Sequence, residues 1–292
     1  MKIIIYGRGF KKEYSEKIGI LFDLLHQNNV EIIIFEKFLK KIKPSFNKSI
    51  PVKIFSSHLD FPRNADFVIS IGGDGTFLET ITYVRDTGIP IIGINLGRLG
   101  FLAHIAEDEI ELAVNAILSG KYSVEDRSLL KLTSKPEVFN DFPFALNEVS
   151  LQKKDSSLIT IHTYIDDHLL NSYWADGLII STPTGSTAYS MSVGGPILTP
   201  ASQNFIISPI APHTLTVRPI VIPNNSHLSL TVEGRSKNFL ASLDSRFETC
   251  SIHTQMKVEL ASFCIKMVSL SKHEFFYTLR NKLMWGADKR NW

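Results

Sequence analysis

The sequence contains little cysteine and little excess charge. Its 292 residues include two cysteines, Cys250 and Cys264, and neither belongs to a C-x-x-C pair. This argues against a zinc site and favours small core residues over a disulfide. The formal net charge is only +2, and charged residues make up 21% of the chain. Nucleic-acid binders usually carry a stronger or more clustered basic excess, so we expect no nucleic-acid partner.

Long hydrophobic runs are also missing. No stretch approaches the ~20 apolar residues that a membrane span requires. The apolar run Ile3–Tyr6 near the N-terminus is too short for a signal peptide. We therefore expect a soluble, cytoplasmic protein with no membrane partner. Because 44% of the residues are hydrophobic, the chain can bury a core for one large domain or two ordinary ones.

Three common active-site motifs are absent. Gly7-Arg8-Gly9 starts like a dinucleotide fingerprint, but Lys12 stands where its third glycine should be. No Gly-Lys-Ser/Thr follows the glycines at 72–75, which excludes a Walker P-loop. No G-x-S-x-G elbow occurs in the hydroxyl-rich block near residue 186, so a serine hydrolase is not supported there.

The first ~120 residues alternate short apolar runs with helical patterns, which is typical of parallel strands joined by crossover helices. Ile18, Leu21, Phe22 and Leu25 share one helical face. We expect an α/β domain over 1–122, a parallel sheet with flanking helices. The expected buried strands are Ile3–Tyr6, Ile32–Phe35, Phe67–Ile71 and Ile91–Ile94.

The periodicity changes after Tyr122. Short, often alternating apolar segments rich in Thr, Ser and Val predict an all-β, sandwich-like second domain over 123–270. The expected extended segments include 145–151, 158–165, 214–222, 227–233, 239–243 and 256–268. Helical periodicity returns over 271–292, where Phe276, Leu279 and Leu283 would form one apolar stripe. We expect this C-terminal helix to complete the first domain by packing back on it.

The turn Gly72-Gly73-Asp74-Gly75 lies between a buried strand and an amphipathic helix. Small residues let backbone N–H groups approach a phosphate there, and a helix N-terminus favours anions. An acid in such a turn adds little to anion binding, but it can hold Mg²⁺ or accept a proton from an attacking hydroxyl. The alternative is a simple tight turn in which Asp74 bonds only to backbone.

A second informative block runs from Asp176 to Ser190. An apolar strand leads into a stretch dense in hydroxyls and glycine. Such residues can hydrogen-bond a ribose and base edges, and Tyr189 can stack on a ring. The competing interpretation is an ordinary Ser/Thr-rich loop.

Together these blocks resemble the NAD kinase family. Gly-Gly-Asp-Gly alone is shared with diacylglycerol and sphingosine kinases and with 6-phosphofructokinases. The block 176–196 is more specific, and so are Asn95–Leu102, Leu146–Glu148 and Pro212–Leu215 with Arg218-Pro219, which occur in the family's order. The resemblance extends from about residue 67 to about residue 250.

The resemblance implies a role for each matching position. Asp74 would accept the proton of the ribose 2′-hydroxyl. Asn147 and Glu148 would contact adenosine, and Asp176 would face the nicotinamide end. Arg246 could contact the diphosphate, tune the preference between NAD and NADH, or form a surface ion pair. The implied nucleotide-binding residues are Gly72, Gly73, Gly75, Arg98, Phe101, Asn147, Glu148, Asp176, Ser186, Thr187, Ala188, Tyr189, Ser190, Ser192, Ala211, His213 and Arg246.

The implied reaction is phosphoryl transfer from ATP or polyphosphate, with Mg²⁺, to NAD. No protein metal-ligand cluster is expected. The resemblance also implies a homo-oligomer, a dimer or a tetramer. A diacylglycerol-type lipid kinase and a non-catalytic NAD(P)-binding regulator remain alternatives. The sequence leaves open the donor and the preference between NAD and NADH.

Overall fold

The computed structural model describes residues 1–42, 50–270 and 275–284. The chain divides into two compact units, which are described separately below. The first unit comprises Met1–Asp126 and Ile265–Trp292, and the second comprises Arg127–Cys264. Two strands run across this division, β7 (Ser123–Lys135) and β18 (Gln255–Ser269). None of the helices in the described ranges combines the length and hydropathy that crossing a bilayer would need.

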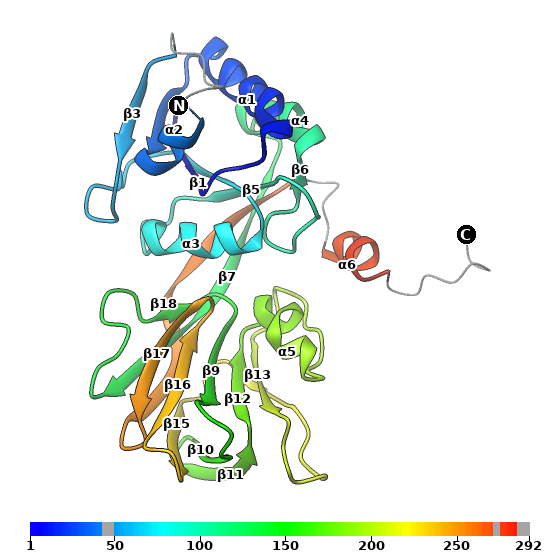
Figure 1. The fold of residues 1–292 in the computed structure, drawn as a ribbon. Coiled ribbons are helices and arrows are strands. Elements are labelled where there is room, and N and C mark those ends of the chain that lie inside the picture. The colour runs from blue at the N-terminus through cyan, green and yellow to red at the C-terminus, as the bar shows by residue number, and fades with distance from the viewer. Residues whose placement is uncertain (43–49, 271–274, 285–292) are drawn as a thin grey trace, which may run out of the picture. The chain divides into compact units, whose positions relative to one another are not determined.

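A parallel sheet forms the centre of the first unit (Figure 1). Its order is β5-β4-β1-β2-β3, with the end of β18 beside β5 and the short β6 (Ile105–Ala106) also paired with β5. The central strands are apolar on both faces because helices cover a parallel sheet on both sides. The strands are β1 (Lys2–Gly7), β2 (Glu31–Phe35), β3 (Val52–Phe55), β4 (Phe67–Ile71) and β5 (Ile91–Asn95).

The helices of this unit each bury one apolar stripe. In α1, the predicted stripe of Ile18, Leu21, Phe22 and Leu25 is buried. The chain leaves α4 through Gly120, whose φ of 71° suits glycine. The helices are α1 (Ser15–Gln27), α2 (Glu36–Ile42), α3 (Asp74–Val84) and α4 (Ile110–Leu118), with 3-10 turns η1 (Lys12–Tyr14) and η3 (Glu107–Glu109).

The second unit is built from antiparallel strands in two sheets. One contains β11-β10-β15-β18 with β7 and β8, and the other has the order β14-β13-β12-β9-β16-β17. Buried side chains of both sheets, such as Ile161 and Leu178, join one hydrophobic cluster, as in a sandwich. The strands are β8 (Phe144–Ala145), β9 (Glu148–Lys153), β10 (Ile159–Ile165), β11 (His168–Ala175), β12 (Gly177–Ser181), β13 (Asn204–Ile210), β14 (Ile220–Pro223), β15 (Leu228–Gly234), β16 (Asn238–Leu243) and β17 (Arg246–Ser251).

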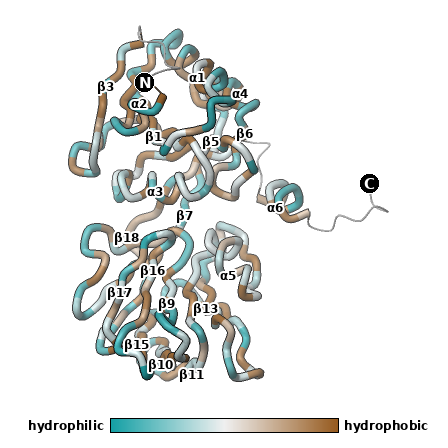
Figure 2. Tube along the Cα trace, viewed as in Figure 1, coloured by the Kyte–Doolittle hydropathy of each residue, from teal (hydrophilic) through white to brown (hydrophobic). Residues whose placement is uncertain are grey.

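The last described helix, α6 (Phe275–Leu283), belongs to the first unit. Hydrophobic and hydrophilic segments alternate along it, as an amphipathic helix requires (Figure 2). The predicted stripe is wrong at its first member, because Phe276 is 53% exposed while Thr278 and Leu279 are buried. The remainder of the predicted helix, 271–274 and 285–292, lies outside the described residues. The predicted fold class is confirmed: an α/β unit, a β unit and a C-terminal helix.

Candidate active site

The turn at Gly72–Gly75 connects β4 to α3. Gly72 has a φ of 147°, and a Cβ there would lie 2.9 Å from Thr76 Cβ, so this position requires glycine. Gly73 caps α3, and Asp74 is the first residue of the helix. Because β4 is parallel to β1 and β5, the turn lies at the carboxyl edge of the sheet, where ligands bind in open α/β folds. The exposed N–H groups of the first turn of α3 favour an anion there.

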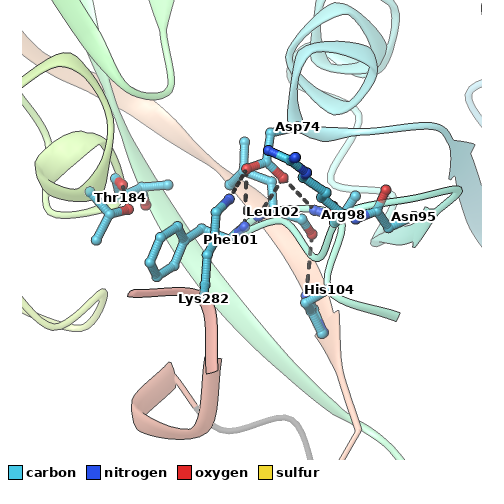
Figure 3. A network of polar contacts seen from close by, with 10 residues as sticks. Asp74, Asn95, Arg98, Phe101, Leu102, His104, Thr184 and Lys282 are labelled. Carbon is cyan, nitrogen blue, oxygen red and sulfur yellow. Dashed lines mark hydrogen bonds and ion pairs between the residues drawn. The ribbon is translucent and has the colours of Figure 1, made fainter. Parts of the chain in front are cut away.

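The Asp74 carboxylate accepts hydrogen bonds from four donors (Figure 3). Oδ1 accepts the backbone N–H groups of Leu102 and Ala103, both at 3.0 Å. Oδ2 accepts the N–H of Phe101 at 3.0 Å and lies 3.3 Å from Lys282 Nζ. A carboxylate offers about four lone-pair sites, so every site on Asp74 has a partner in this state. The side chain nevertheless remains 31% exposed.

The segment after β5 is shaped to present its N–H groups to Asp74. Gly100 packs directly against the carboxylate, and its own N–H donates to the Ala103 carbonyl at 3.0 Å. The Asn95 side-chain amide donates to the Arg98 carbonyl, which fixes the start of the segment. Gly97 has a φ of 131°, a backbone conformation suited to glycine. These contacts explain why the Asn95–Leu102 motif occurs beside an acid-bearing turn.

Lys282 was not predicted to belong to this site. It comes from α6, 208 residues after Asp74, and its ammonium also lies 4.7 Å from the centre of the Phe101 ring. Phe275 at the start of α6 contacts the same ring, with centroids 6.3 Å apart. A lysine near the end of an amphipathic helix is common, so no local sequence signal distinguishes it.

In the second unit, Asp244 holds the segment that contains Asn147 and Glu148. Its Oδ1 accepts the N–H groups of Asn147 at 2.7 Å and Glu148 at 3.2 Å, and its Oδ2 accepts that of Leu146 at 2.9 Å. Burial raises the pKa of Asp244, while these N–H groups and Arg246 act in the opposite direction. Asp244 is thus a structural clamp on the predicted adenosine-binding pair.

The hydroxyl-rich block also holds this segment, through Leu146 and Asn147. Thr182 N–H donates to the Asn147 carbonyl at 2.9 Å, and Thr182 Oγ1 donates to the Leu146 carbonyl at 2.6 Å. Gly185 packs so closely on Asn147 that an added Cβ would lie 2.7 Å from Asn147 Cα. The block is not a plain loop, because 184–187 form the 3-10 helix η4 (Thr184–Thr187) and 189–192 form α5 (Tyr189–Ser192).

Glu148 has a strongly perturbed carboxyl. Burial, and secondly the charge of Asp244, raise its pKa to about 8, against an opposing hydrogen bond from the Tyr189 backbone. Its Oε2 has no hydrogen-bond partner among the described residues. A neutral, buried carboxyl with a free oxygen can donate to or accept from a polar group of a ligand. Perturbed acids of this kind gather at functional sites.

The remaining hydroxyls of the block have mixed environments. Ser186 Oγ accepts the N–H of Leu198 at 3.0 Å, and Ser190 Oγ bonds to Ser208 Oγ at 3.1 Å, so both take part in internal contacts. Thr187 and Ala188 are half-buried, whereas Tyr189 is 37% exposed and Ser192 is exposed.

Four further predicted residues lie at strand ends of the second unit. Asp176, between β11 and β12, forms an ion pair with Lys153 at 2.6 Å. The His213 ring lies 4.8 Å from that of Trp174, and Ala211 adopts a φ of 42°. The Arg246 guanidinium donates to the carbonyls of Phe142 and Phe144 and lies 5.1 Å from the Phe142 ring centre.

The structure therefore gathers the predicted residues into two groups. Gly72, Gly73, Asp74, Gly75, Arg98 and Phe101 lie around the turn of the first unit, and Asn147, Glu148 and the 182–190 block lie together in the second. A parallel α/β unit that carries an acid in a glycine turn, joined to an antiparallel β unit, defines a phosphotransferase of the Gly-Gly-Asp-Gly class.

Comparison with known proteins identifies the family of the chain. Residues 8–122 match the family model of the ATP-NAD kinase N-terminal domain, and residues 146–268 match that of the C-terminal domain. The NAD kinase of Flavobacterium psychrophilum is 48% identical over 294 residues, and that of Cytophaga hutchinsonii is 45% identical over 298. Each alignment covers the whole of both chains.

Two solved structures share the fold. A yeast NADH kinase complexed with NADH has a TM-score of 0.86 at 22% identity and matches 99% of this chain and 89% of its own. An NAD kinase from Archaeoglobus fulgidus in complex with ATP has a TM-score of 0.74 at 23% identity, with 97% and 99% covered. The chain thus belongs to the NAD kinase family, and its activity is that of a kinase acting on NAD.

Proposed function

We propose that this enzyme transfers the terminal phosphoryl group of ATP to the 2′-hydroxyl of the adenosine ribose of NAD, with Asp74 as the proton acceptor. The observation that carries this proposal is the position of Asp74. It is a partly exposed carboxylate at the N-terminus of α3, oriented by three backbone N–H groups. Binding of phosphate alone would gain nothing from an acid at this position.

In the proposed step, the 2′-oxygen forms a bond to the terminal phosphorus while the bond from that phosphorus to the bridging oxygen breaks. The hydroxyl proton passes to a carboxylate oxygen of Asp74, and the diphosphate leaves with the bonding electron pair. Phosphoryl transfer of this kind depends on positioning and charge neutralisation. The N–H groups at the start of α3, with Gly72, Gly73 and Gly75 around them, would hold the donor phosphates.

NAD would be bound by the pair in the second unit. Glu148 offers a buried, neutral carboxyl at neutral pH, and Tyr189, whose backbone donates to that carboxyl, is itself exposed. A carboxyl and an aromatic face suit the hydroxyls and the flat base of an adenosine. We propose that Asn147 and Glu148 contact adenosine and that Thr187, Ala188, Tyr189 and Ser192 line the dinucleotide, with Asp176 and His213 further along it.

We propose that Mg²⁺ enters with the donor phosphates and neutralises their charge. Among the described residues no three His, Cys, Asp or Glu side chains gather as a metal site, and both Asp74 oxygens already accept hydrogen bonds. Mg²⁺ commonly keeps several waters and binds through substrate phosphates, which fits this assignment.

We also propose a cytoplasmic location and a homo-oligomeric state. Two free cysteines fit a reducing compartment. Exposed apolar side chains of the second unit, Leu169, Trp174 and Leu215, supply surface that an association could cover. Light scattering of the purified enzyme would report the oligomeric state.

The test of the proton acceptor is Asp74→Asn in an assay that follows NADP formation from NAD, ATP and Mg²⁺. We expect a loss of turnover by at least about 10²-fold, since a general base contributes 10²–10⁴-fold. Asp86→Asn is the matched control, because Asp86 is an exposed acid of the same unit that pairs only with Arg63 in the described contacts. Near-normal turnover of Asp74→Asn would refute the assignment.

The same assay tests the phosphoryl donor. NADP formation with polyphosphate alone would replace ATP as the donor.

A further inference from the structure

We propose that Lys282 is a donor-binding residue that pairs with Asp74 until the nucleoside triphosphate arrives and then moves to its terminal phosphate. The proposal rests on the proposed function, which places the donor at the Gly72–Gly75 turn. It adds a residue from α6 to a site otherwise built from β4, α3 and the segment after β5.

The first support is the saturation of Asp74. Each of its oxygens already accepts two donors, which accounts for the lone pairs of a carboxylate. A proton from the ribose hydroxyl can be accepted only after one of the four donors leaves. Proton acceptance by Asp74 therefore requires a rearrangement at this carboxylate.

The second support is that Lys282 is the only one of the four that is a side chain. The N–H groups of Phe101, Leu102 and Ala103 belong to a backbone segment that is fixed by Gly100 and Asn95. Lys282 has a flexible four-carbon side chain, which is 32% exposed. Its ion pair with Asp74 is partly exposed to water and is therefore weak. Lys282 is thus the donor that can leave Asp74 at the least cost.

The third support is the place to which the Lys282 ammonium would move. The ammonium lies 3.3 Å from the first residue of α3, whose N-terminal N–H groups favour an anion. A triphosphate there carries more negative charge than one carboxylate, so the lysine would exchange a weak partner for a stronger one. Lysine is a common phosphate ligand because its ammonium is a mobile point charge. The exchange breaks no covalent bond.

The position of α6 keeps the lysine within reach during this exchange. Phe275 and the Lys282 ammonium both contact the ring of Phe101, at 6.3 Å and 4.7 Å between centres. The helix is therefore held to the same segment that orients Asp74, while the ammonium can change partners. The contact with the Phe101 ring keeps Lys282 near the segment after β5 but does not hold its ammonium to Asp74.

The test measures binding of a non-hydrolysable ATP analogue with Mg²⁺ by calorimetry, which does not depend on turnover. We expect Lys282→Met to weaken this binding about tenfold, to raise the KM for ATP and to leave the KM for NAD within about twofold. Lys282→Arg should retain most of the affinity because it keeps the charge. Arg280→Met is the matched control, since Arg280 is an exposed cation on the same helix.

A second arm tests the exchange itself. Asp74→Asn should tighten binding of the analogue by about two- to fivefold, because Lys282 no longer has to leave a partner. In the Lys282→Met background the same change should tighten binding less. The two proposals can also be told apart. Near-normal turnover by Asp74→Asn would refute the role of Asp74 as proton acceptor, while the affinity of Lys282→Met for the analogue would still test whether Lys282 binds the donor.

Two outcomes would overturn the proposal. Wild-type affinity for the analogue in Lys282→Met would remove Lys282 from the donor site. An increase in kcat with unchanged affinity would make the lysine an inhibitory partner of Asp74 instead of a ligand of the donor.

Discussion

Gly100 packs directly against the carboxylate of Asp74: a Cβ at residue 100 would lie 2.7 Å from Asp74 Cγ and 2.9 Å from the Ala103 carbonyl oxygen. The Ala103 oxygen belongs to the backbone, and the Asp74 carboxylate cannot move away without losing its hydrogen bonds to the N–H groups of this segment. The backbone N–H groups of residues 101–103 can therefore donate to Asp74 only if residue 100 has no side chain. This explains why residue 100 is glycine.

Gly100→Ala should therefore displace Asp74 and lower kcat by about 10²-fold, the size of effect that a misplaced catalytic group produces. Steady-state kinetics would measure it, and circular dichroism would show that the fold persists. Gly19→Ala is the control, because nothing lies within 4 Å of a Cβ at this position in the middle of α1. It should keep full activity and stabilise the protein by about 1 kcal/mol. Normal kcat in Gly100→Ala would contradict the steric account.

Asp244→Asn should destabilise the second unit and weaken NAD binding. Asparagine can adopt the φ of 53° found at this position, but its amide would turn one N–H donor toward the N–H of Leu146 or Asn147. We expect a loss of about 2 kcal/mol in the free energy of unfolding, measured with urea, since an unsatisfied buried donor costs ~1–3 kcal/mol.

The matched control for that change is Asp167→Asn. Asp167 also has a positive φ, 65°, but it is exposed. It should leave both stability and the KM for NAD near wild type. If Asp244→Asn behaved like this control, Asp244 would not be the clamp on Asn147 and Glu148.

Glu148 should make the folded protein less stable as the pH rises. The unfolded residue loses its proton near 4.5, whereas burial holds the proton in the folded state up to about pH 8. Between these values the folded state binds the extra proton, so stability falls by up to about 1.4 kcal/mol per pH unit and levels off above pH 8. Urea unfolding at pH 5 and pH 8 would measure this loss.

Glu148→Gln provides the comparison, because it has the same shape and does not titrate. It should lose less stability than wild type between pH 5 and pH 8, so the difference between the two proteins should grow with pH. Parallel pH dependence in both proteins would show that Glu148 ionises normally in the fold.

Arg246→Gln should lower stability without changing the choice between NAD and NADH. Its guanidinium is already engaged by the Phe142 and Phe144 carbonyls and by the Phe142 ring. Hydrogen bonds from a charged group contribute ~1.5–3 kcal/mol, so we expect a loss of about 2 kcal/mol. Arg235→Gln, at an exposed arginine nearby in sequence, is the control. A changed ratio of kcat/KM for NAD and NADH in Arg246→Gln would instead place this arginine at the dinucleotide.

Strands that are buried on both faces could be predicted from sequence, because their apolar runs are continuous. The predicted runs at Ile3, Ile32, Phe67 and Ile91 all lie in strands of the first unit. Strands at sheet edges were missed. β3 exposes Lys53 and Ile54, and β11 exposes Leu169 and Trp174, so neither has the alternation that a half-buried strand would show.

One predicted strand was wrong over most of its length. The segment 214–222 was expected to be extended, but only Ile220–Pro223 pairs, with β13. Val217 N–H instead donates to the Thr214 carbonyl in a local turn. Thr and Val favour strands, but the pairing with β13 ends at Ile207 and Ile220.

The site could be predicted where its chemistry is local in sequence. The glycine turn and the hydroxyl-rich block each carry their own signature. Lys282 and the clamp role of Asp244 depend on contacts across 208 and 97 residues. Nothing adjacent to either residue predicts these contacts, so only the folded chain could show them.

The first unit is discontinuous, and this determines when the contacts around Asp74 can form. Met267 of β18 pairs with Ile91 of β5, and Lys282 reaches Asp74, so the sheet edge and the carboxylate contacts both need residues that follow the entire second unit. During synthesis, the glycine turn leaves the ribosome long before its lysine. A nascent chain that stops within the second unit therefore lacks the pairing of β18 with β5. It also lacks the contact of Lys282 with the Asp74 carboxylate. Formation of the contacts around Asp74 is in this way tied to completion of the chain.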